Sequence, residues 1–244
     1  AKSKADGYTI GRGQTANLAI NPAALPKMPF DPAKDVVPVA LVAEIPMVLV
    51  VATQSPLKSL ADLVKAAKAK PAGLNQALAS TGTVGHLAGE MLARKAGFKV
   101  VNVPYKGAAP ALTEMIGGQT DYMFATPQSV MGLLQAGKLR ALAVSSSKRV
   151  AALAHVPTVA ESGYPGFEAI DWKVIVAPAG TPAEIVKQLN AATAKALAEP
   201  ALIAKLAEEG SVPMQGNPEQ VARFIKSEQG EWGALIREAG IRFE

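Results

Sequence analysis

The sequence predicts an α/β fold with two lobes, each built on a mainly parallel β-sheet flanked by helices. Between Met47 and Ser147, short apolar runs alternate with helical patterns, which is typical of βαβ units and a parallel sheet. The chain has 244 residues, 49% of them hydrophobic, which is enough for one large domain or two ordinary ones. The segments on either side of this central region each lack a complete lobe, so we expect them to combine into one.

The central lobe is expected to begin with a helix that Ser55 caps, with Pro56 at its first position. Leucine, valine and alanine then repeat on one face until Pro71-Ala72-Gly73 ends the helical pattern. Strands and helices are expected to alternate from there, as strand Leu74–Ala79, helix Thr83–Ala96, strand Lys99–Val103, helix Ala109–Ile116, strand Tyr122–Ala125, helix Gln128–Ala136 and strand Leu139–Val144.

The two ends of the chain supply the other lobe. We expect a strand at Tyr8–Ile10, followed by a glycine turn, and a strand at Val174–Ala177. The run Thr181-Pro182-Ala183-Glu184 predicts a capping box that opens a helix. A ligand cleft is expected between the lobes, since clefts at domain interfaces and at the carboxyl ends of parallel strands are where ligands bind. The expected division is residues 1–52 for the first part of lobe 1, residues 53–175 for lobe 2 and residues 176–244 for the rest of lobe 1.

Small hydroxyl residues and glycines separate the strand expected at Leu74–Ala79 from the helix that follows it. A strand that leads into such a turn leaves the first N–H groups of the helix without acceptors, glycine lets a ligand approach closely, and the helix dipole favours negative charge. The turn therefore predicts an anion site. An ordinary helix N-cap is the alternative, because Ser and Thr are preferred caps with or without a ligand. The candidate ligand-binding residues of this turn are Ser80, Thr81, Gly82 and Thr83.

A second glycine turn fits the pattern Gly-x-Gly-x-x-Ala, and Asp35 follows about twenty residues later, as in a dinucleotide fingerprint. A Rossmann unit needs a full helix after the glycines, and Pro22 arrives too early for one, so we expect no NAD site. The turn is expected instead to offer backbone N–H groups to a ligand. Its candidate residues are Thr15, Ala16 and Asn17.

Three further residues are candidates for the ligand site. His86 could donate to an anion or act as a general base, or it could be an ordinary capping or packing residue. Lys106 could supply positive charge to a carboxylate, or it could be a solvated lysine. Asp171 could accept a hydrogen bond from a ligand, or it could cap a neighbouring segment.

Composition excludes several classes of site. The chain has no cysteine and two histidines, His86 and His155, far apart in sequence, so we expect no disulfide, no metal site and no cofactor. No nucleophile and base lie close together in a known catalytic pattern, so we expect no catalytic residue. The excess of 25 Lys and Arg over 20 Asp and Glu gives a net charge of +5, but the basic residues are scattered, which argues against nucleic acid. No apolar stretch is long enough for a membrane span.

Several segments together resemble the solute-binding receptors of tripartite tricarboxylate transporters, the TctC or Bug type. They are DGYTI with AINPAALPKMPFDPAKDVVPVALV, STGTVGHLAGEMLARKAGFKVVNVPYKGAAPALTEMIGGQTDYMF, AGKLRALAVSSSKR, VPTVAESGYPGFE and APAGTPAEIVKQLN, in order along nearly the whole chain. The resemblance implies a periplasmic, non-enzymatic receptor with the two-lobe fold of type II periplasmic binding proteins. Such a receptor closes on a small mono- or dicarboxylate and delivers it to a membrane permease, and we expect it to be a monomer.

The chain departs from the family pattern in three places. Family members begin with another strand and a Pro- and Gly-rich turn, so we expect the first strand of lobe 1 to be missing. Asn17-Leu18 replaces a frequent Thr-His, and Ala125 replaces a frequent Asp. Two other functions stay open, an enzyme that acts on a carboxylate through His86 and a ligand-sensing domain.

Overall fold

The computed structural model describes residues 1–241, and the chain divides into two compact units. Unit 1 is formed by Ala1–Glu44 together with the chain from Asp171 onward, and unit 2 is formed by Ile45–Ile170. The two-lobe α/β class is confirmed. The chain passes from one unit to the other near the end of strand β2 (Val36–Pro46) and at the start of strand β8 (Ile170–Pro178), several residues before the boundaries expected from the sequence.

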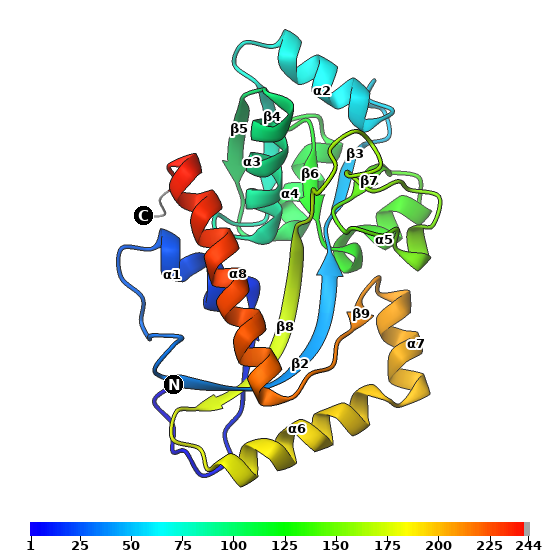
Figure 1. Ribbon diagram of the computed structural model, residues 1–244. Coiled ribbons are helices and arrows are strands. Elements are labelled where there is room, and N and C mark those ends of the chain that lie inside the picture. Colours follow the sequence, from blue (N-terminus) through cyan, green and yellow to red (C-terminus); the bar gives the residue numbers. More distant parts are fainter. Residues whose placement is uncertain (242–244) are drawn as a thin grey trace. The chain divides into compact units, whose positions relative to one another are not determined.

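Unit 2 is an α/β sandwich in which strands and helices alternate (Figure 1). Hydrogen bonds place its strands in the order β5-β4-β6-β3-β7, with a parallel bridge between Gln76 and Tyr122 linking β4 to the start of β6. Strands β4 and β5 pair in parallel, and β3 pairs antiparallel with both β6 and β7. All strands except β3 therefore run in one direction, as expected for this lobe. The elements are β3 (Val48–Ala52), α2 (Leu60–Ala69), β4 (Leu74–Leu78), α3 (Val84–Ala96), β5 (Val100–Pro104), α4 (Ala108–Ile116), β6 (Met123–Ala125), α5 (Pro127–Gln135), β7 (Leu139–Val144) and the 3₁₀ turn η2 (Ala151–Leu153).

The strand order of unit 2 decides which helices share a face of its sheet. The connection from β4 through α3 to β5 moves toward one edge, whereas the connections through α4 and α5 move toward the other. Because crossovers between parallel strands are right-handed, α3 covers one face and α4 and α5 cover the other. The carboxyl ends of β4, β5, β6 and β7 meet at one edge of the sheet, and this edge carries the turns that lead into α3, α4 and α5.

The start of α2 corrects the sequence prediction. The helix begins at Leu60, and its cap is Ser59 rather than Ser55, because the Ser59 side chain accepts a hydrogen bond from the backbone N–H of Asp62. The Asp62 carboxylate accepts hydrogen bonds in return from the Ser59 hydroxyl and the Lys58 backbone N–H. This reciprocal pair satisfies several donors at the helix start, which the expected cap at Ser55 does not do.

Unit 1 holds a sheet of order β1-β8-β2-β9. Strand β1 pairs antiparallel with β8, β9 pairs antiparallel with β2, and Figure 1 shows β2 and β8 running in opposite directions. The expectation of a mainly parallel sheet in this lobe was therefore wrong. The expectation assumed βαβ units, in which a crossover connection joins two parallel neighbours. In this sheet the neighbouring strands come from opposite ends of the chain, so no such unit makes them parallel. The remaining elements are β1 (Gly11–Gln14), the π-helix η1 (Ala16–Ile20), α1 (Asn21–Ala24), α6 (Ala183–Leu197), α7 (Pro200–Glu208), β9 (Val212–Pro213) and α8 (Pro218–Ala239).

Two local predictions in unit 1 are also wrong. Tyr8–Ile10 lies outside any strand and Tyr8 is exposed, while the glycine turn expected after it is strand β1. Glycine suits position 13, because a Cβ there would lie 2.4 Å from a methyl group of Leu18 and 2.6 Å from one of Val174 on the neighbouring strand. Thr181 does not cap α6; its hydroxyl donates to the carbonyl of Pro178, and the helix begins at Ala183.

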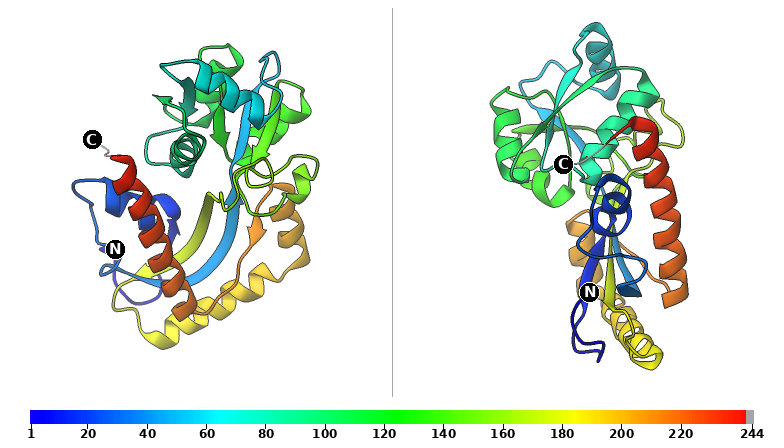
Figure 2. Two further views of the ribbon diagram at one scale, coloured as in Figure 1. Left: turned by 45° about the horizontal axis from the view of Figure 1, so that its top comes forward. Right: turned by 90° about the vertical axis from the view of Figure 1, so that its left-hand side faces the viewer.

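The core of unit 1 is completed by helix α8, which packs along η1 and α1 (Figure 2). A capping box between Asn217 and Gln220 fixes the start of α8. The fully buried Trp172 packs edge-on against Phe224 of α8, at 5.3 Å between ring centroids, and its indole N–H donates to the Glu228 carboxylate. No helix in the described chain has the length and apolar character of a membrane span.

Candidate functional site

The turn between β4 and α3 presents small polar groups at the carboxyl edge of the unit 2 sheet. Ser80 and Thr81 are exposed, Thr83 is half-buried, and Gly82 is buried with φ of 72°. A residue with a side chain rarely adopts this left-handed conformation, so Gly82 is what lets the chain turn into the helix. Ser80, Thr81, Gly82 and Thr83 therefore lie together in one turn, as the sequence indicated.

Hydrogen bonds inside the turn decide which of its donors are available. Thr83 caps α3, since its hydroxyl oxygen accepts from the His86 backbone N–H at 3.3 Å, and the hydroxyl donates to the Ser80 carbonyl at 3.1 Å. The Gly82 N–H donates to His86 Nδ1 at 3.3 Å and is therefore occupied. Within residues 1–241, the backbone N–H groups of Val84 and Gly85 are left without an acceptor, as is usual for the first turn of a helix. The Gly82 N–H and the Thr83 hydroxyl are thus engaged inside the turn, so fewer of its groups can face a ligand than the sequence predicted.

His86 is part of the scaffold of this turn. The side chain is buried, and burial lowers the pKa of the imidazole from 6.5 to about 4, so the ring is neutral at pH 7. Because Nδ1 accepts from Gly82, the proton of the neutral ring is on Nε2, which lies 4.0 Å from a carboxylate oxygen of Glu90. Both ring nitrogens thus face groups of unit 2 itself.

Buried side chains of the unit 2 sheet hold the first turn of α3 in place. Gln76 on β4 is fully buried, and its amide donates to the Gly85 carbonyl at 2.8 Å. The Tyr122 hydroxyl donates to the Gln76 side-chain oxygen at 3.3 Å, and burial raises the pKa of that phenol. A Cβ on Gly89 would lie 1.6 Å from the Gln76 side chain, and a Cβ on Gly85 would lie 2.3 Å from the backbone oxygen of Phe124. The helix can therefore approach the sheet this closely only because both positions are glycine.

The turn between β5 and α4 lies beside the first turn and is built more simply. Lys106 is exposed, and Gly107, with φ of 115°, precedes the first residue of α4. The Tyr105 N–H donates to the Leu78 carbonyl at 2.9 Å, and the Gly107 N–H donates to the Ala79 carbonyl at 2.8 Å. These two bonds hold the backbone around Lys106 next to the end of β4, so the structure brings this lysine near the Ser80–Thr83 turn.

A third turn, between β6 and α5, was missed by the sequence analysis. The hydroxyl oxygens of Thr126 and Ser129 lie 2.9 Å apart at the start of α5, on the same edge of the sheet. Thr-Pro-x-Ser directly after a short strand was a detectable signal, because Pro127 stands at the first helical position. Ala125 is the last residue of β6 and is buried just before this turn.

The remaining candidates, Thr15, Ala16, Asn17 and Asp171, gather in unit 1 where β1 meets η1. The buried Thr15 hydroxyl oxygen accepts from the Trp172 N–H at 2.8 Å, and the Asn17 side-chain oxygen accepts from the Gln14 N–H at 2.8 Å. Ala16 is the first residue of η1. The Asp171 carboxylate forms an ion pair with Lys173. These polar side chains thus stabilise the junction of β1, β8 and η1, and a contact with ligand stays a prediction for them.

No group of three or more metal-ligating side chains occurs in the part of the chain that the structure describes. The arrangement that remains is two adjacent turns with helix N–H groups, hydroxyls and a lysine at one sheet edge. Such a set of donors can hold an oxyanion without a metal.

Similarity to known proteins identifies the family of the chain. The sequence model of the tripartite tricarboxylate transporter family receptor, TctC, matches residues 1–241. The chain belongs to this receptor family. Among solved structures, R. palustris Rpa4515 with adipate is 37% identical with a TM-score of 0.92, and the match covers 99% of our chain and 81% of that one.

Two other solved structures are similar to this TctC-family chain. MatC (Rpa3494) from Rhodopseudomonas palustris, with bound malate, is 31% identical with a TM-score of 0.85, covering 96% of our chain and 81% of that one. The periplasmic binding protein BugD is 30% identical with a TM-score of 0.88, covering 100% of our chain and 82% of that one.

Proposed function

We propose that this chain is the periplasmic receptor of a tripartite tricarboxylate transporter and that it captures a small carboxylate for a membrane permease. The observation that carries this proposal is the turn between β4 and α3, which holds the exposed Ser80 and Thr81 and the first backbone N–H groups of α3. The neighbouring turn carries Lys106 and is tied to the end of β4 by two backbone hydrogen bonds. In this proposal one carboxylate of the ligand accepts hydrogen bonds from these groups. The helix dipole adds about 0.3–1 kcal/mol of attraction for the negative charge.

The class of ligand follows from this chemistry together with the relatives. The adipate and malate bound by the two R. palustris proteins are both dicarboxylates. The donors at this turn are neutral dipoles plus one exposed cation, which suits a carboxylate head without requiring a particular body. We therefore propose a mono- or dicarboxylate of similar size. In this proposal the turn binds one carboxylate group that all these acids share. Contacts with the rest of the ligand would then determine which acid is preferred.

The structure favours capture over chemical conversion. A general base must present a free nitrogen to its substrate, whereas the His86 nitrogens face Gly82 and Glu90. The Thr83 hydroxyl is also engaged as the cap of α3. We propose that both residues position the turn and that the ligand leaves chemically unchanged.

A screen of small carboxylates by thermal shift tests the proposal. We expect malate, adipate or a related acid to raise the melting temperature, because a ligand that binds only the folded chain stabilises it in proportion to RT ln(1 + [L]/Kd). Mass spectrometry of the recovered ligand is expected to show the same compound. The amide of the best acid is the matched control, and it should not stabilise the chain.

Two outcomes would contradict the proposal. Stabilisation by the amide as large as that by the acid would show that the charge is not recognised. Conversion of the ligand would instead support the enzyme function. Size-exclusion chromatography with light scattering on the same sample tests the proposed monomer.

A further inference from the structure

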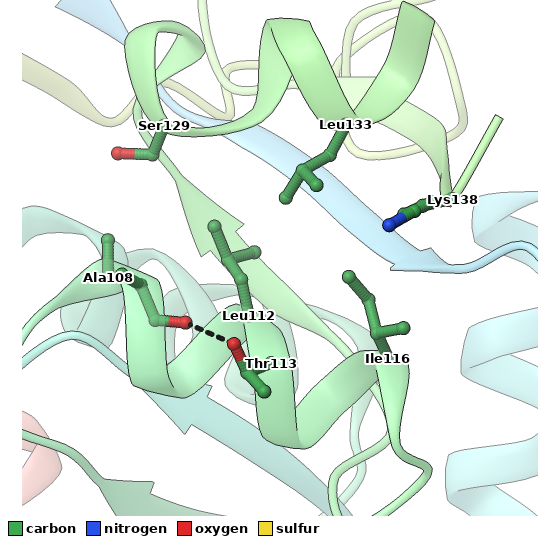
Figure 3. A pocket seen from close by; sticks show the side chains of 8 residues that line it. Ala108, Leu112, Thr113, Ile116, Ser129, Leu133 and Lys138 are labelled. Carbon is green, nitrogen blue, oxygen red and sulfur yellow. Dashed lines mark hydrogen bonds between the residues drawn. The ribbon is translucent and has the colours of Figure 1, made fainter. Parts of the chain in front are cut away.

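A groove between α4 and α5 lies on the face of unit 2 that these two helices cover (Figure 3). Its volume is about 480 Å³, which falls within the range of small-molecule sites, about 300–1,000 Å³. The residues that line it belong to α4, to α5 and to Lys138 just beyond α5, so the groove does not include the Ser80–Thr83 turn.

One stripe of residues on each helix forms a wall of the groove, and the stripe is apolar on α4 and mixed on α5. Ala108, Leu112 and Ile116 repeat every four residues along α4, and Ser129 and Leu133 do so along α5, so each set lies on one face of its helix. Figure 3 shows these faces turned toward each other across the open space. Leu112 is buried, while Ile116 and Leu133 are half-buried and keep apolar surface available to a ligand.

Lys138 places a positive charge at one end of these stripes. Its side chain is exposed, and Figure 3 shows the ammonium pointing into the groove toward Leu133 and Ile116. The Lys138 backbone N–H donates to the Leu133 carbonyl at 2.9 Å, which fixes the residue over the last turn of α5. No carboxylate among the described residues forms an ion pair with this ammonium.

The other polar side chains that line the groove are already paired. The Thr113 hydroxyl donates to the Ala109 carbonyl at 3.0 Å (Figure 3), and the Ser129 hydroxyl lies 2.9 Å from that of Thr126. Lys138 is thus the group in the groove that gains most from an incoming polar partner. Charge complementarity selects an anion at this end and an apolar chain along the rest.

We propose that this groove binds a small monoanionic amphiphile, a carboxylate with a medium-length apolar chain. The site is separate from the turn between β4 and α3. The carboxylate pairs with Lys138, and the apolar chain runs between Leu112 and Leu133 toward Ala108. This occupant differs in chemistry from a short, fully polar dicarboxylate, which has no apolar part to cover the two stripes. The proposal does not rest on the function of the β4–α3 turn.

Octanoate is the probe, titrated into the intact chain by calorimetry. From the size of the ligand we expect a dissociation constant on the order of 0.1–1 mM. Lys138→Met, which keeps the aliphatic part of the side chain, is expected to weaken binding about threefold to fivefold, as for the loss of one exposed ion pair. Lys68→Met, at an exposed lysine of α2, is the matched control and should leave the affinity unchanged.

Methyl-labelled NMR of the same chain locates the ligand directly. We expect contacts from the octanoate chain to the methyl groups of Leu112, Ile116 and Leu133, unchanged when adipate is present in excess. Octylamine, which has the same chain and the opposite charge, should bind at least tenfold more weakly. The proposal is overturned if octylamine binds as well as octanoate, if Lys138→Met has no effect, if the contacts appear elsewhere, or if no saturable binding is found.

Discussion

The two turns that lead into α3 and α4 stand side by side at one sheet edge but are built in opposite ways. In the first, Gly82, Thr83 and His86 bond to one another, and Gln76 holds the Gly85 carbonyl from below. In the second, Lys106 is exposed, and two backbone hydrogen bonds tie the chain around it to the end of β4. The first turn is therefore fixed before a ligand arrives, whereas the second supplies a mobile charge.

This difference indicates how the two turns would share the work of binding. Fixed dipoles lose little conformational entropy when an anion binds, so we expect the first turn to determine the position of the carboxylate. An exposed lysine loses rotamer freedom and its charge is screened, so it adds attraction at long range and little at contact. Four predictions test whether the first turn is rigid and dominant.

The largest effect on the free energy of unfolding is expected from Gly89→Ala. The added Cβ would overlap the Gln76 side chain, at 1.6 Å from its oxygen, and would force α3 away from β4 or break the bond to Gly85. Overpacking together with a lost buried hydrogen bond predicts a decrease of about 3 kcal/mol in the free energy of unfolding. Urea denaturation measures it.

Gly132→Ala is the matched control for this change. Gly132 lies inside α5 with no neighbouring atom within 4 Å of the added Cβ, so alanine is expected to raise stability by up to about 1 kcal/mol. If both variants were equally stable, the close packing of α3 on β4 would not be what fixes the turn.

The second effect is a pH dependence of stability that arises from His86. The folded-state pKa of about 4 lies below the unfolded value of 6.5, so the unfolded chain binds more protons between these two values. Stability is therefore complete above pH 6.5 and falls as the pH drops toward 4. From this shift we expect a loss of about 2 kcal/mol between pH 7 and pH 5.

Chemical denaturation of the parent and of His86→Gln at several pH values measures this contribution. The variant should lose most of the slope between pH 7 and pH 5, whereas His155→Gln, at an exposed histidine, should keep it. An unchanged slope in His86→Gln would mean that the buried imidazole does not resist protonation.

The third effect concerns ligand affinity. Thr83→Asp keeps a side chain that can cap α3, so the fold should be retained, but its charge lies beside the proposed anion position. We expect affinity for the best carboxylate to fall at least tenfold, about 1.4 kcal/mol, by calorimetric titration. Thr83→Val, which removes the hydroxyl and keeps the backbone donors, should reduce the affinity less than Thr83→Asp does.

The smallest effect is expected from Lys106→Met. Loss of one exposed charge is predicted to weaken binding by about 1 kcal/mol or less, and the difference from the parent should shrink as salt is added. If Lys106→Met abolished binding while Thr83→Asp bound as tightly as the parent, the anion would sit at the second turn and the roles would be reversed.

The local features of unit 2 could be predicted from the sequence. The alternation of apolar runs and helical patterns predicted its strands and helices, and the Ser80–Thr83 turn lies where the sequence indicated, with Thr83 as the cap of α3. These features depend on hydrogen bonds and on the spacing of apolar residues within a dozen residues of the chain. Patterns of this length can be recognised in the sequence itself.

The chemical state of the candidate site residues depended on contacts that no local pattern reports. The position of His86 after a glycine turn allowed a ligand contact or a catalytic base, and its burial made it a neutral acceptor for Gly82. Thr126 and Ser129 share the sheet edge with the first turn only because β6 lies next to β4.

The sequence by itself therefore determined the order of elements in unit 2, the position of the Ser80–Thr83 turn and the receptor family. The tertiary structure decided the direction of the strands in unit 1 and which donors remain open at the turn. The bond from the Trp172 N–H to the Thr15 hydroxyl joins residues 157 positions apart, and the glycine strand β1 exists because β8 lies beside it. Contacts between residues so far apart in the sequence are stabilised by burial in the folded core. The residues next to each partner in the sequence therefore do not reveal these contacts.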